Sequence, residues 1–530
     1  MHIDESQYKV QDLVDRKRTS SYYTTYDGIS VIRSFLKEVP SREGAVLMDP
    51  FMGSGVLLSS VDDLVKPSRV IGIEINKEPC ELGRKMLSSI YDSVEVICGD
   101  AFKVAWKYKA DIIVSNPPFV RWHLISNRDE LLNSVISHGY GSFVSRRDPG
   151  LHILSIFLMD YILKEGGHAL LVLPASTFYT RQGDGVKKLL KYRYDVIAMA
   201  ENLKSPSFSS GSGFKELIVF LRKRKLFEFN AVQTAIYQYD GNLKESRRVN
   251  LSKMPKLLDR NWLSLFDYDN AEAVAEMIEK ALDMGLLRYL RKGEIIRGVE
   301  MYGPDFFFIP NRAWSIVGED ESSVLISNRE QTLRLPKRYL VKCLRKPEYY
   351  NDSIVVHDPR FYAIAINDDP EGDVAKYVEW GERQNIPALK FGSKWYQHVW
   401  RQLQTKKPYG HVFIHDKLDP TRHVILANYS EKPLCASKNF YIIRENNPLI
   451  AAWLNSSIMQ YILQTFSKRI SDNWTRLLED DYLEIPVPSK VKDVDLSSVQ
   501  NAEKAIEEYL DIRSINATII KDPPNSIHEL

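Results

Sequence analysis

The sequence contains little cysteine and no long apolar run, and both absences narrow the classes of protein to which it can belong. Its four cysteines lack the paired spacing of a zinc site, so we expect neither a metal nor a disulfide framework. No apolar run approaches the roughly 20 residues that span a bilayer. The first residues also lack the basic and apolar regions of a signal peptide. We therefore expect a cytoplasmic protein without a membrane segment.

The net charge of +2 is uninformative because 71 basic residues nearly balance 69 acidic ones, but the local distribution is uneven. Six basic residues and no acidic one lie between Glu330 and Glu348, and five lie in the acid-free stretch Lys390–His415. Basic residues mixed with aromatic ones fit a surface that contacts phosphates and bases, or simply two solvated faces. The candidate DNA-binding residues are Lys337, Arg338, Lys394, Trp395, Tyr396, Lys406 and Lys407.

The chain lacks internal repeats, and its 530 residues with 44% hydrophobic content predict about two to four globular domains. Up to residue 225, strand-like runs alternate with amphipathic helical stretches, which is typical of a parallel α/β sheet. The expected helices include Ile29–Glu38, Glu78–Ile90 and Leu151–Leu163. The expected strands are Ala45–Met48, Val70–Ile73, Val94–Ile97, Ile112–Val114, Ala169–Leu173, Val196–Ala200 and Leu217–Leu221.

The rest of the chain is less regular. The basic run Arg222–Lys225 is expected to close the first domain, and residues 226–292 to form a connecting segment with a long helix over Asn270–Leu290. Strand-like pieces between turns predict an α+β domain over residues 293–490, with few helices before Leu449–Phe466. Residues 491–530 are expected to hold a helix over Ser497–Asp511 and a tail.

A glycine-rich turn, Asp49–Gly55, follows the first expected strand and precedes a helical stretch. Glycines there let a ligand lie against the backbone. Glu74 ends the next strand, where a carboxylate can bind both hydroxyls of a ribose, and Asp100 follows the strand after that. Taken singly, Glu74 could cap a helix and Asp100 could make a turn, but together they predict a nucleoside site. The third glycine of a dinucleotide-binding turn is absent, which favours S-adenosylmethionine.

The sequence Asn116-Pro117-Pro118-Phe119 follows the fourth expected strand. Two prolines stiffen this loop and leave its carbonyls free to accept hydrogen bonds, and the Asn116 side chain adds an acceptor. Two acceptors suit a primary aromatic amine, and Phe119 offers a stacking face that is worth about 1–3 kcal/mol per base. Asn-Pro-Pro is also a good turn, but its place after the glycine turn and both acids favours direct methyl transfer to an amine that Asn116 and the Pro117 carbonyl hold.

An adenine amine inside a duplex is paired, so an enzyme that modifies it must flip the base out. A second apolar wall would hold the flipped base opposite Phe119. Phe208, on a loop before the last expected strand, is the candidate. An ordinary loop phenylalanine is the alternative.

These motifs, in this order, resemble the gamma-class (Taq-type) adenine-specific DNA methyltransferases, although many members have tyrosine at the position of Phe119. The resemblance implies a Rossmann-like α/β catalytic domain over residues 1–225 that binds S-adenosylmethionine, and a C-terminal α+β target-recognition domain over 293–490. Its implied cofactor contacts are Tyr22, Thr24, Asp49, Phe51, Gly53, Gly55, Glu74, Ile75, Asp100 and Asn116. The implied catalytic residues are Asn116, Pro117, Pro118 and Phe119, and the implied base contacts are Phe119 and Phe208.

Other interpretations stay open: a methyltransferase that acts on RNA or on a protein glutamine, or an inactive DNA-binding subunit. The long second half argues against the first two, and the intact Asn116–Phe119 motif argues against the third. The expected partner is double-stranded DNA. No nuclease domain precedes the catalytic region, which argues against a fused restriction-modification enzyme. We expect a monomer, and any cognate restriction endonuclease is expected to be a separate protein. His411 and His415 are interpreted as structural or DNA-contacting histidines, not metal ligands.

Overall fold

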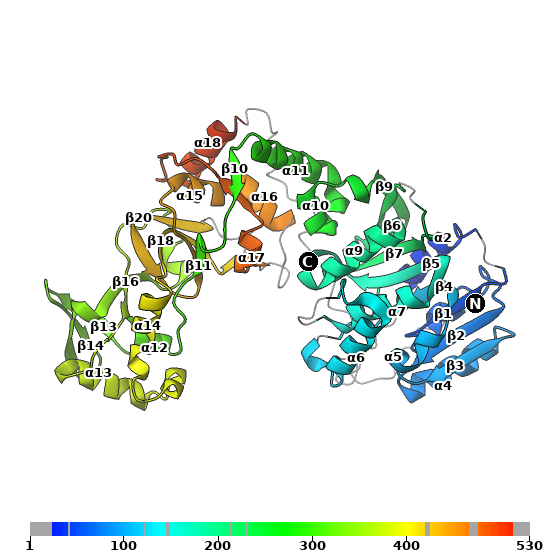
Figure 1. The fold of residues 1–530 in the computed structure, drawn as a ribbon, viewed down its shortest axis with the longest axis horizontal. Helices are drawn as coiled ribbons and strands as arrows, with labels where there is room; N and C mark the ends of the chain where they lie inside the picture. Colours follow the sequence, from blue (N-terminus) through cyan, green and yellow to red (C-terminus); the bar gives the residue numbers. More distant parts are fainter. Residues whose placement is uncertain are drawn as a thin grey trace. The chain divides into compact units, whose positions relative to one another are not determined.

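The computed structural model describes residues 24–40, 43–120, 122–144, 149–210, 215–228, 232–418, 425–465 and 475–511 (Figure 1). The chain forms two compact units that divide within helix α11 (Tyr268–Asp283), between Ala275 and Glu276. No helix in the described ranges is both long enough and apolar enough to cross a membrane.

A nine-stranded sheet forms the centre of the first unit, with strand order β3-β2-β1-β4-β5-β7-β6-β8-β9 (Figure 1). The first five strands of this order run parallel, and β7 lies antiparallel between β5 and β6. Parallel strands are buried on both faces, which explains the apolar runs in the sequence. The strands are β1 (Val46–Asp49), β2 (Arg69–Glu74), β3 (Val94–Cys98), β4 (Ala110–Ser115), β5 (Leu163–Pro174), β6 (Tyr194–Asn202), β7 (Glu216–Lys223), β8 (Thr234–Tyr239) and β9 (Leu243–Val249).

All seven predicted strands are confirmed, but the sheet does not end at residue 225 as predicted. Strands β8 and β9 extend it to Val249, and the unit itself runs to Ala275. The sequence hid β9 because this edge strand is polar and largely exposed. The run Arg222–Lys225 is also no linker: Arg222 and Lys223 lie in β7, and Arg224 Nε donates to the buried Asp195 carboxylate at 2.9 Å.

Helices pack against this sheet wherever an apolar face recurs with helical spacing. Thr25 caps the first of them, since its side chain accepts the Gly28 N–H, and the buried Ile29, Ile32 and Leu36 form its inner face. The three predicted helices are confirmed within three residues at each end. The helices of this unit are α2 (Tyr26–Leu36), α3 (Val56–Ser59), α4 (Lys77–Ser88), α5 (Ala101–Val104), α6 (Arg128–Val135), α7 (Leu151–Ile162), α8 (Ser176–Tyr179), α9 (Asp184–Arg193) and α10 (Lys256–Arg260).

The second unit has the expected α+β character. Its main sheet has seven strands in the order β11-β21-β18-β20-β16-β17-β12, beside a three-stranded sheet, β13-β14-β15. Two-stranded pairs join β10 to β23 and β19 to β22. The strands are β10 (Leu287–Tyr289), β11 (Ile295–Arg297), β12 (Phe308–Ile309), β13 (Ser315–Glu319), β14 (Ser323–Ser327), β15 (Thr332–Pro336), β16 (Leu340–Leu344), β17 (Phe361–Ile364), β18 (Tyr409–His415), β19 (Lys417–Leu418), β20 (Ala427–Ala436), β21 (Phe440–Ile443), β22 (Thr475–Arg476) and β23 (Pro486–Pro488).

The helices after residue 275 differ from the prediction in two places. The expected helix over Asn270–Leu290 ends at Asp283, because Gly285 takes a positive φ of 68° and a strand begins at Leu287. The expected helix over Leu449–Phe466 is interrupted at Asn455, whose side-chain oxygen accepts the backbone N–H of Leu426. The helices are α12 (Pro304–Phe307), α13 (Gly372–Arg383), α14 (His398–Thr405), α15 (Pro448–Leu454), α16 (Ser457–Thr465), α17 (Glu479–Tyr482) and α18 (Val499–Leu510), the last of which confirms the predicted C-terminal helix.

Candidate active site

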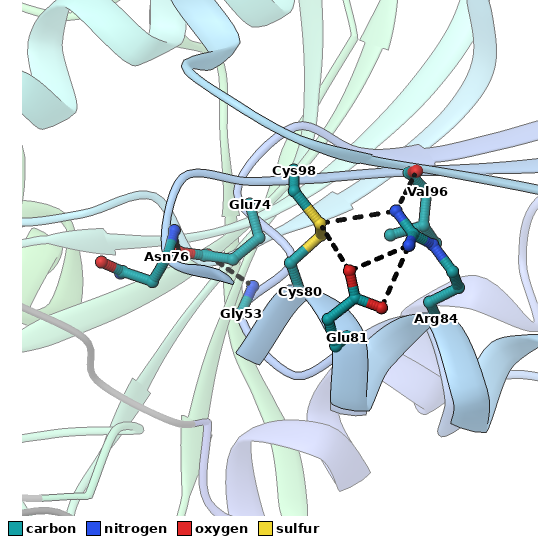
Figure 2. Close-up of a disulfide and its surroundings, with 8 residues drawn as sticks. All are labelled: Gly53, Glu74, Asn76, Cys80, Glu81, Arg84, Val96 and Cys98. Carbon is teal, nitrogen blue, oxygen red and sulfur yellow. Dashed lines mark hydrogen bonds and ion pairs between the residues drawn. A yellow bond between two sulfur atoms is a disulfide. The ribbon is translucent and has the colours of Figure 1, made fainter. Parts of the chain in front are cut away.

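The Glu74 carboxylate joins the glycine-rich turn to the start of helix α4. One of its oxygens accepts the Gly53 N–H at 3.1 Å and the other accepts the Asn76 N–H at 2.8 Å (Figure 2). Burial raises the pKa of Glu74, although both hydrogen bonds oppose this shift. A carboxylate has about four acceptor positions, so Glu74 can still accept hydrogen bonds from a ligand.

Asp49 organises the other side of the turn from the end of β1. It is 1% exposed, and its Oδ1 accepts the Phe51 N–H at 2.9 Å and the Ser115 hydroxyl at 2.6 Å. Burial raises the pKa of Asp49 to about 7. The bond to Phe51 shapes the turn, and the bond to Ser115 ties the end of β1 to the end of β4, where the Asn116 loop begins.

Asp100 caps the short helix after β3, since its Oδ1 accepts the Phe102 N–H at 2.9 Å. The same residue lines the pocket formed by the glycine turn. The turn-making and ligand-binding interpretations of Asp100 are therefore compatible.

A disulfide joins Cys80 in α4 to Cys98 at the end of β3, with an S–S distance of 2.07 Å (Figure 2). The prediction of no disulfide is wrong here. A separation of 18 residues matches no disulfide framework, and the two cysteines meet only because α4 packs on β2 and β3. The bridge lies directly before Gly99 and Asp100, so it fixes the base of the pocket to α4.

The structure describes no group of three or more His, Cys, Asp or Glu side chains that could hold a metal ion. His411 lies on β18 and shares a hydrogen bond of 2.9 Å with the Ser430 carbonyl. His415 is fully buried and lies 3.2 Å from the Asn428 side-chain oxygen. Both histidines have the surroundings of structural residues.

An open pocket of about 440 Å³ lies at the carboxyl ends of β1, β2, β3 and β4. Such strand ends form the usual ligand site of an open α/β sheet. Ile75, an apolar residue of the lining, is 66% exposed. Phe102 also lines the pocket although the sequence did not predict it, and its ring lies 6.1 Å from that of Phe51. The predicted residues that line the pocket are Thr24, Asp49, Phe51, Gly53, Glu74, Ile75, Asp100, Asn116 and Pro118.

Asn116 begins the loop that follows β4 and borders this pocket. Its side-chain nitrogen donates to the Thr24 hydroxyl at 3.1 Å and to the Ser209 hydroxyl at 2.9 Å. The far end of the loop is fixed by α7, because the Val120 carbonyl accepts the Leu151 N–H at 2.9 Å. The Asn-Pro-Pro-Phe segment is thus held at both ends.

The remaining predicted site residues are not part of the pocket lining. Phe119 is 8% exposed and meets the edge of the His152 ring at 6.2 Å. Gly55 has a φ of 80°, and a Cβ there would lie 3.3 Å from Leu87 of α4, so it serves the turn. Pro117 is not part of the lining either. Tyr22 lies outside the described residues.

Phe208 does not form the second wall of the pocket. It is completely buried, and its ring packs 6.3 Å from that of Tyr239. Its carbonyl accepts the backbone N–H of Thr25 at 2.8 Å, and an isolated β-bridge joins Thr24 to Ser209. This pairing turns the phenylalanine inward beneath α2, which a loop position in the sequence could not reveal.

The sequence that forms this pocket also matches a known protein family. Residues 9–271 match the model of the N-6 DNA methylase family. The match spans all nine strands of the sheet in the first unit. The enzyme is therefore an adenine-specific DNA methyltransferase with S-adenosylmethionine as its cofactor, and the expected α/β class is confirmed.

One curated relative and one solved structure show how far this likeness extends. The Type II methyltransferase M.AccI of Acinetobacter calcoaceticus is 16% identical over 431 residues, which cover 77% of this chain and 73% of the relative. The solved structure of the Type IIL restriction-modification enzyme MmeI in complex with DNA overlaps 96% of this chain and 78% of its own, with 13% identity and a TM-score of 0.56. The fold likeness therefore includes the second unit of the methyltransferase.

The aromatic candidates for DNA contact in the second unit are core residues. Trp395 is 2% exposed and Tyr396 is 5% exposed, so the expectation that they contact DNA is corrected. The ring of Phe306 lies 4.5 Å from that of Trp395. Trp395 and Tyr396 therefore belong to the hydrophobic core and do not form a base-stacking surface.

Two of the five basic candidates in the second unit pair with acidic residues from elsewhere in the chain. Lys337 pairs with Glu319 at 2.8 Å, and Lys394 pairs with Asp369 at 3.1 Å. Arg338 is exposed and donates to the Tyr339 hydroxyl. Lys406 and Lys407 are exposed as well, and no ion pair involves either of them within the described part of the chain.

Proposed function

We propose that this enzyme is a gamma-class methyltransferase that methylates the 6-amino group of an adenine flipped out of duplex DNA. The cofactor supplies an electrophilic methyl group on a sulfonium, and the nitrogen–carbon bond forms as the carbon–sulfur bond breaks. The amine then loses a proton to water. The observation that carries the proposal is the position of Asn116, which borders the pocket with its amide nitrogen already bonded to Thr24 and Ser209.

The pocket residues fit S-adenosylmethionine. Glu74 and Asp100 present carboxylates at the ends of the neighbouring strands β2 and β3, which suit the hydroxyl and amino groups of an adenosine. Ile75 offers an exposed apolar face for the base. Thr24 and Phe51 line the same pocket, and the Thr24 hydroxyl accepts a hydrogen bond from the Asn116 amide nitrogen.

Asn116 and Pro117 are proposed to hold the adenine amine that receives the methyl group. The amine of adenine is a poor nucleophile because its lone pair is delocalised into the ring. The two N–H groups of this amine would donate to the Asn116 side-chain oxygen and to the Pro117 carbonyl. These hydrogen bonds favour a pyramidal nitrogen, whose lone pair is then available to attack the methyl group. Phe119 adds an apolar wall beside this point, and the neighbouring His152 is neutral at pH 7 because burial lowers its pKa to about 4.

The second unit is proposed as the target-recognition domain, with Lys406 and Lys407 as phosphate contacts. M.AccI is described as a Type II methyltransferase, which supports a role in a restriction-modification or related system. We propose that the enzyme acts as a monomer and that its cognate endonuclease, if the system has one, is a separate protein.

Methyl transfer from labelled S-adenosylmethionine tests this proposal. The substrate is amplified genomic DNA, which carries every short sequence without methyl groups, and the modified nucleoside is identified by mass spectrometry. N6-Methyldeoxyadenosine is expected from the parent enzyme and not from Asn116→Ala. Asn133→Ala, which changes an exposed asparagine of α6, is the matched control and should keep the parent activity. Transfer only to RNA or protein, or an active Asn116→Ala, would contradict the proposal.

Base flipping has its own test once the methylated sequence is known. Flipping a base costs a few kcal/mol, and it costs least when the target adenine is already mismatched. The enzyme should therefore bind a duplex with a mismatch at that adenine more tightly than the matched duplex. Equal affinity for both duplexes would contradict flipping.

A further inference from the structure

The amide of Asn116 is oriented by a short chain of hydrogen bonds that begins at a buried carboxylate. Glu216, the first residue of β7, is completely buried, and its Oε2 accepts the Ser209 hydroxyl at 2.8 Å. The Ser209 oxygen in turn accepts from the Asn116 side-chain nitrogen at 2.9 Å. We propose that Ser209 and Glu216 are positioning residues for methyl transfer. This inference rests on the proposed function of Asn116.

The direction of the chain follows from the hydrogens that are available. A carboxylate can only accept, and a hydroxyl has one hydrogen. Ser209 gives its hydrogen to Glu216, so the contact with Asn116 can form only if the amide presents its nitrogen. The amide oxygen then lies on the other branch of the side chain. The hydrogen-bond partners of the Asn116 amide therefore fix its orientation.

The orientation decides whether Asn116 can serve its proposed role. An amide oxygen accepts a hydrogen from the adenine amine, whereas a flipped amide would set its own N–H groups against the N–H groups of the substrate. Thr24 holds the second amide hydrogen at 3.1 Å, but its hydroxyl can donate as well as accept. Glu216 and Ser209 therefore fix the orientation of the Asn116 amide, which Thr24 alone does not.

The loop around Ser209 is built on the same carboxylate. The Phe208 N–H also donates to Glu216 Oε2, at 3.0 Å, and the Glu216 N–H donates back to the Pro206 carbonyl at 2.8 Å. The Ser207 hydroxyl supports the loop differently, since it donates to the Ser209 carbonyl and accepts the Ser209 N–H, both at 2.9 Å. Ser207 thus braces the backbone of Ser209 without taking part in the chain to Asn116.

Steady-state kinetics of Ser209→Ala test the inference. We expect kcat to fall about 10- to 100-fold, because one of the two groups that orient the amide is lost and an unfavourable amide orientation becomes accessible. The KM for S-adenosylmethionine, the affinity for DNA and the melting temperature should stay near their parent values. Ser209→Thr keeps the hydroxyl and should restore most of kcat. Ser210→Ala, at an exposed position of the same loop, is the matched control and should leave kcat within about 3-fold of the parent.

A second variant keeps the inference testable if Ser209→Ala folds poorly. Ser209→Cys retains the volume but replaces the hydroxyl by a weak donor and acceptor, so it should show the same loss of kcat. The inference is overturned if these variants keep the kcat of the parent enzyme. It is also overturned if Ser210→Ala loses as much kcat as they do, or if their loss of kcat accompanies weaker cofactor binding. If the parent enzyme methylates no adenine, the proposed function itself is wrong, and this inference is overturned with it.

Discussion

The Glu74 carboxylate accepts the Gly53 N–H at 3.1 Å across 21 positions of sequence, so the end of β2 holds the turn that follows β1. A second bond, from the Asn76 N–H at 2.8 Å, fixes the same carboxylate to the start of α4. Two backbone donors therefore set the direction of the Glu74 oxygens before any ligand binds. A preoriented acceptor lowers the cost of binding because fewer rotamers must be ordered.

Replacing Glu74 by glutamine should weaken cofactor binding. An amide has one acceptor oxygen, so one of the two backbone donors loses its partner and faces an NH₂ group instead. We expect the dissociation constant for S-adenosylmethionine, measured by isothermal titration calorimetry, to rise about 10- to 100-fold. Glu78→Gln changes an exposed glutamate in the first turn of the same helix and is the control. Equal affinities of the two variants would contradict a binding role for Glu74.

Asp49 makes stability depend on pH. Burial raises its pKa from 3.8 to about 7, so between these values the folded chain holds a proton that the unfolded chain has released. The free energy of unfolding contributed by Asp49 therefore falls as the pH rises from about 4 to about 7, and stays low above that. Asp49→Asn removes the charge, and its side-chain oxygen can still accept from Phe51 and Ser115.

Thermal unfolding without cofactor measures this effect. Asp49→Asn should melt above the parent at pH 8, and the difference should shrink towards pH 4. Asp62→Asn, at an exposed position after α3, should follow the parent at every pH. A constant offset between Asp49→Asn and the parent would show that Asp49 does not titrate in this range.

The disulfide between Cys80 and Cys98 should stabilise the first unit. It closes a loop with a sequence separation of 18, for which loss of unfolded-state entropy contributes about 3 kcal/mol. Disulfides are rare where glutathione keeps thiols reduced. The midpoint of chemical denaturation should therefore fall when reductant is added to the parent enzyme. For the double variant Cys80→Ala, Cys98→Ala, the midpoint should be the same with and without reductant. A parent curve that ignores the reductant would contradict the bridge.

Trp395 should matter for stability and not for DNA stacking. Its ring packs against Phe306 at 4.5 Å, and a Cβ on Gly381 would lie only 2.7 Å from it. Trp395→Ala should lower the free energy of unfolding by about 3–5 kcal/mol, as is usual for truncation of a buried tryptophan. Phe391→Ala, at a ring that is 38% exposed, is the control and should cost far less. A stable Trp395→Ala with weak DNA binding would support the original stacking hypothesis.

The sequence revealed most of the pocket because its residues lie next to the ends of buried strands. An apolar run followed by glycine or an acid marks both the strand and the ligand edge, and this is why Glu74, Asp100 and Asn116 were found together. Phe102 was not predicted as a pocket residue because it lies in a short helix of four residues that carries no motif of its own.

Contacts between distant segments could not be predicted in this way. The bond from Asn116 to Ser209 spans 93 positions, and nothing in the loop around Phe208 distinguishes a ligand-facing aromatic ring from one that fills the core. The prediction of DNA contacts from runs of basic residues failed at Lys337 and Lys394 for a related reason. Lys337 and Lys394 each pair with an acid from another segment, so a basic stretch in the sequence is not a basic surface in the fold.

Lys406 and Lys407 are the basic candidates that should contact DNA phosphates. Both side chains are exposed and neither joins an ion pair in the described part of the chain, so binding DNA would not break an internal contact. Each phosphate contact releases about one counterion, so Lys406→Ala with Lys407→Ala should reduce the slope of log affinity against log salt by about two. Affinity should fall equally for target and non-target duplexes, because phosphates carry no sequence information.

Lys394→Ala is the matched control for this measurement, because the Lys394 ammonium group already pairs with Asp369 at 3.1 Å. Fluorescence anisotropy at several salt concentrations should give a slope for Lys394→Ala close to that of the parent. If Lys394→Ala lowers the slope as much as the Lys406 and Lys407 changes do, internal pairing does not keep a lysine from DNA. If none of the variants changes the slope, the phosphate contacts lie elsewhere on the enzyme.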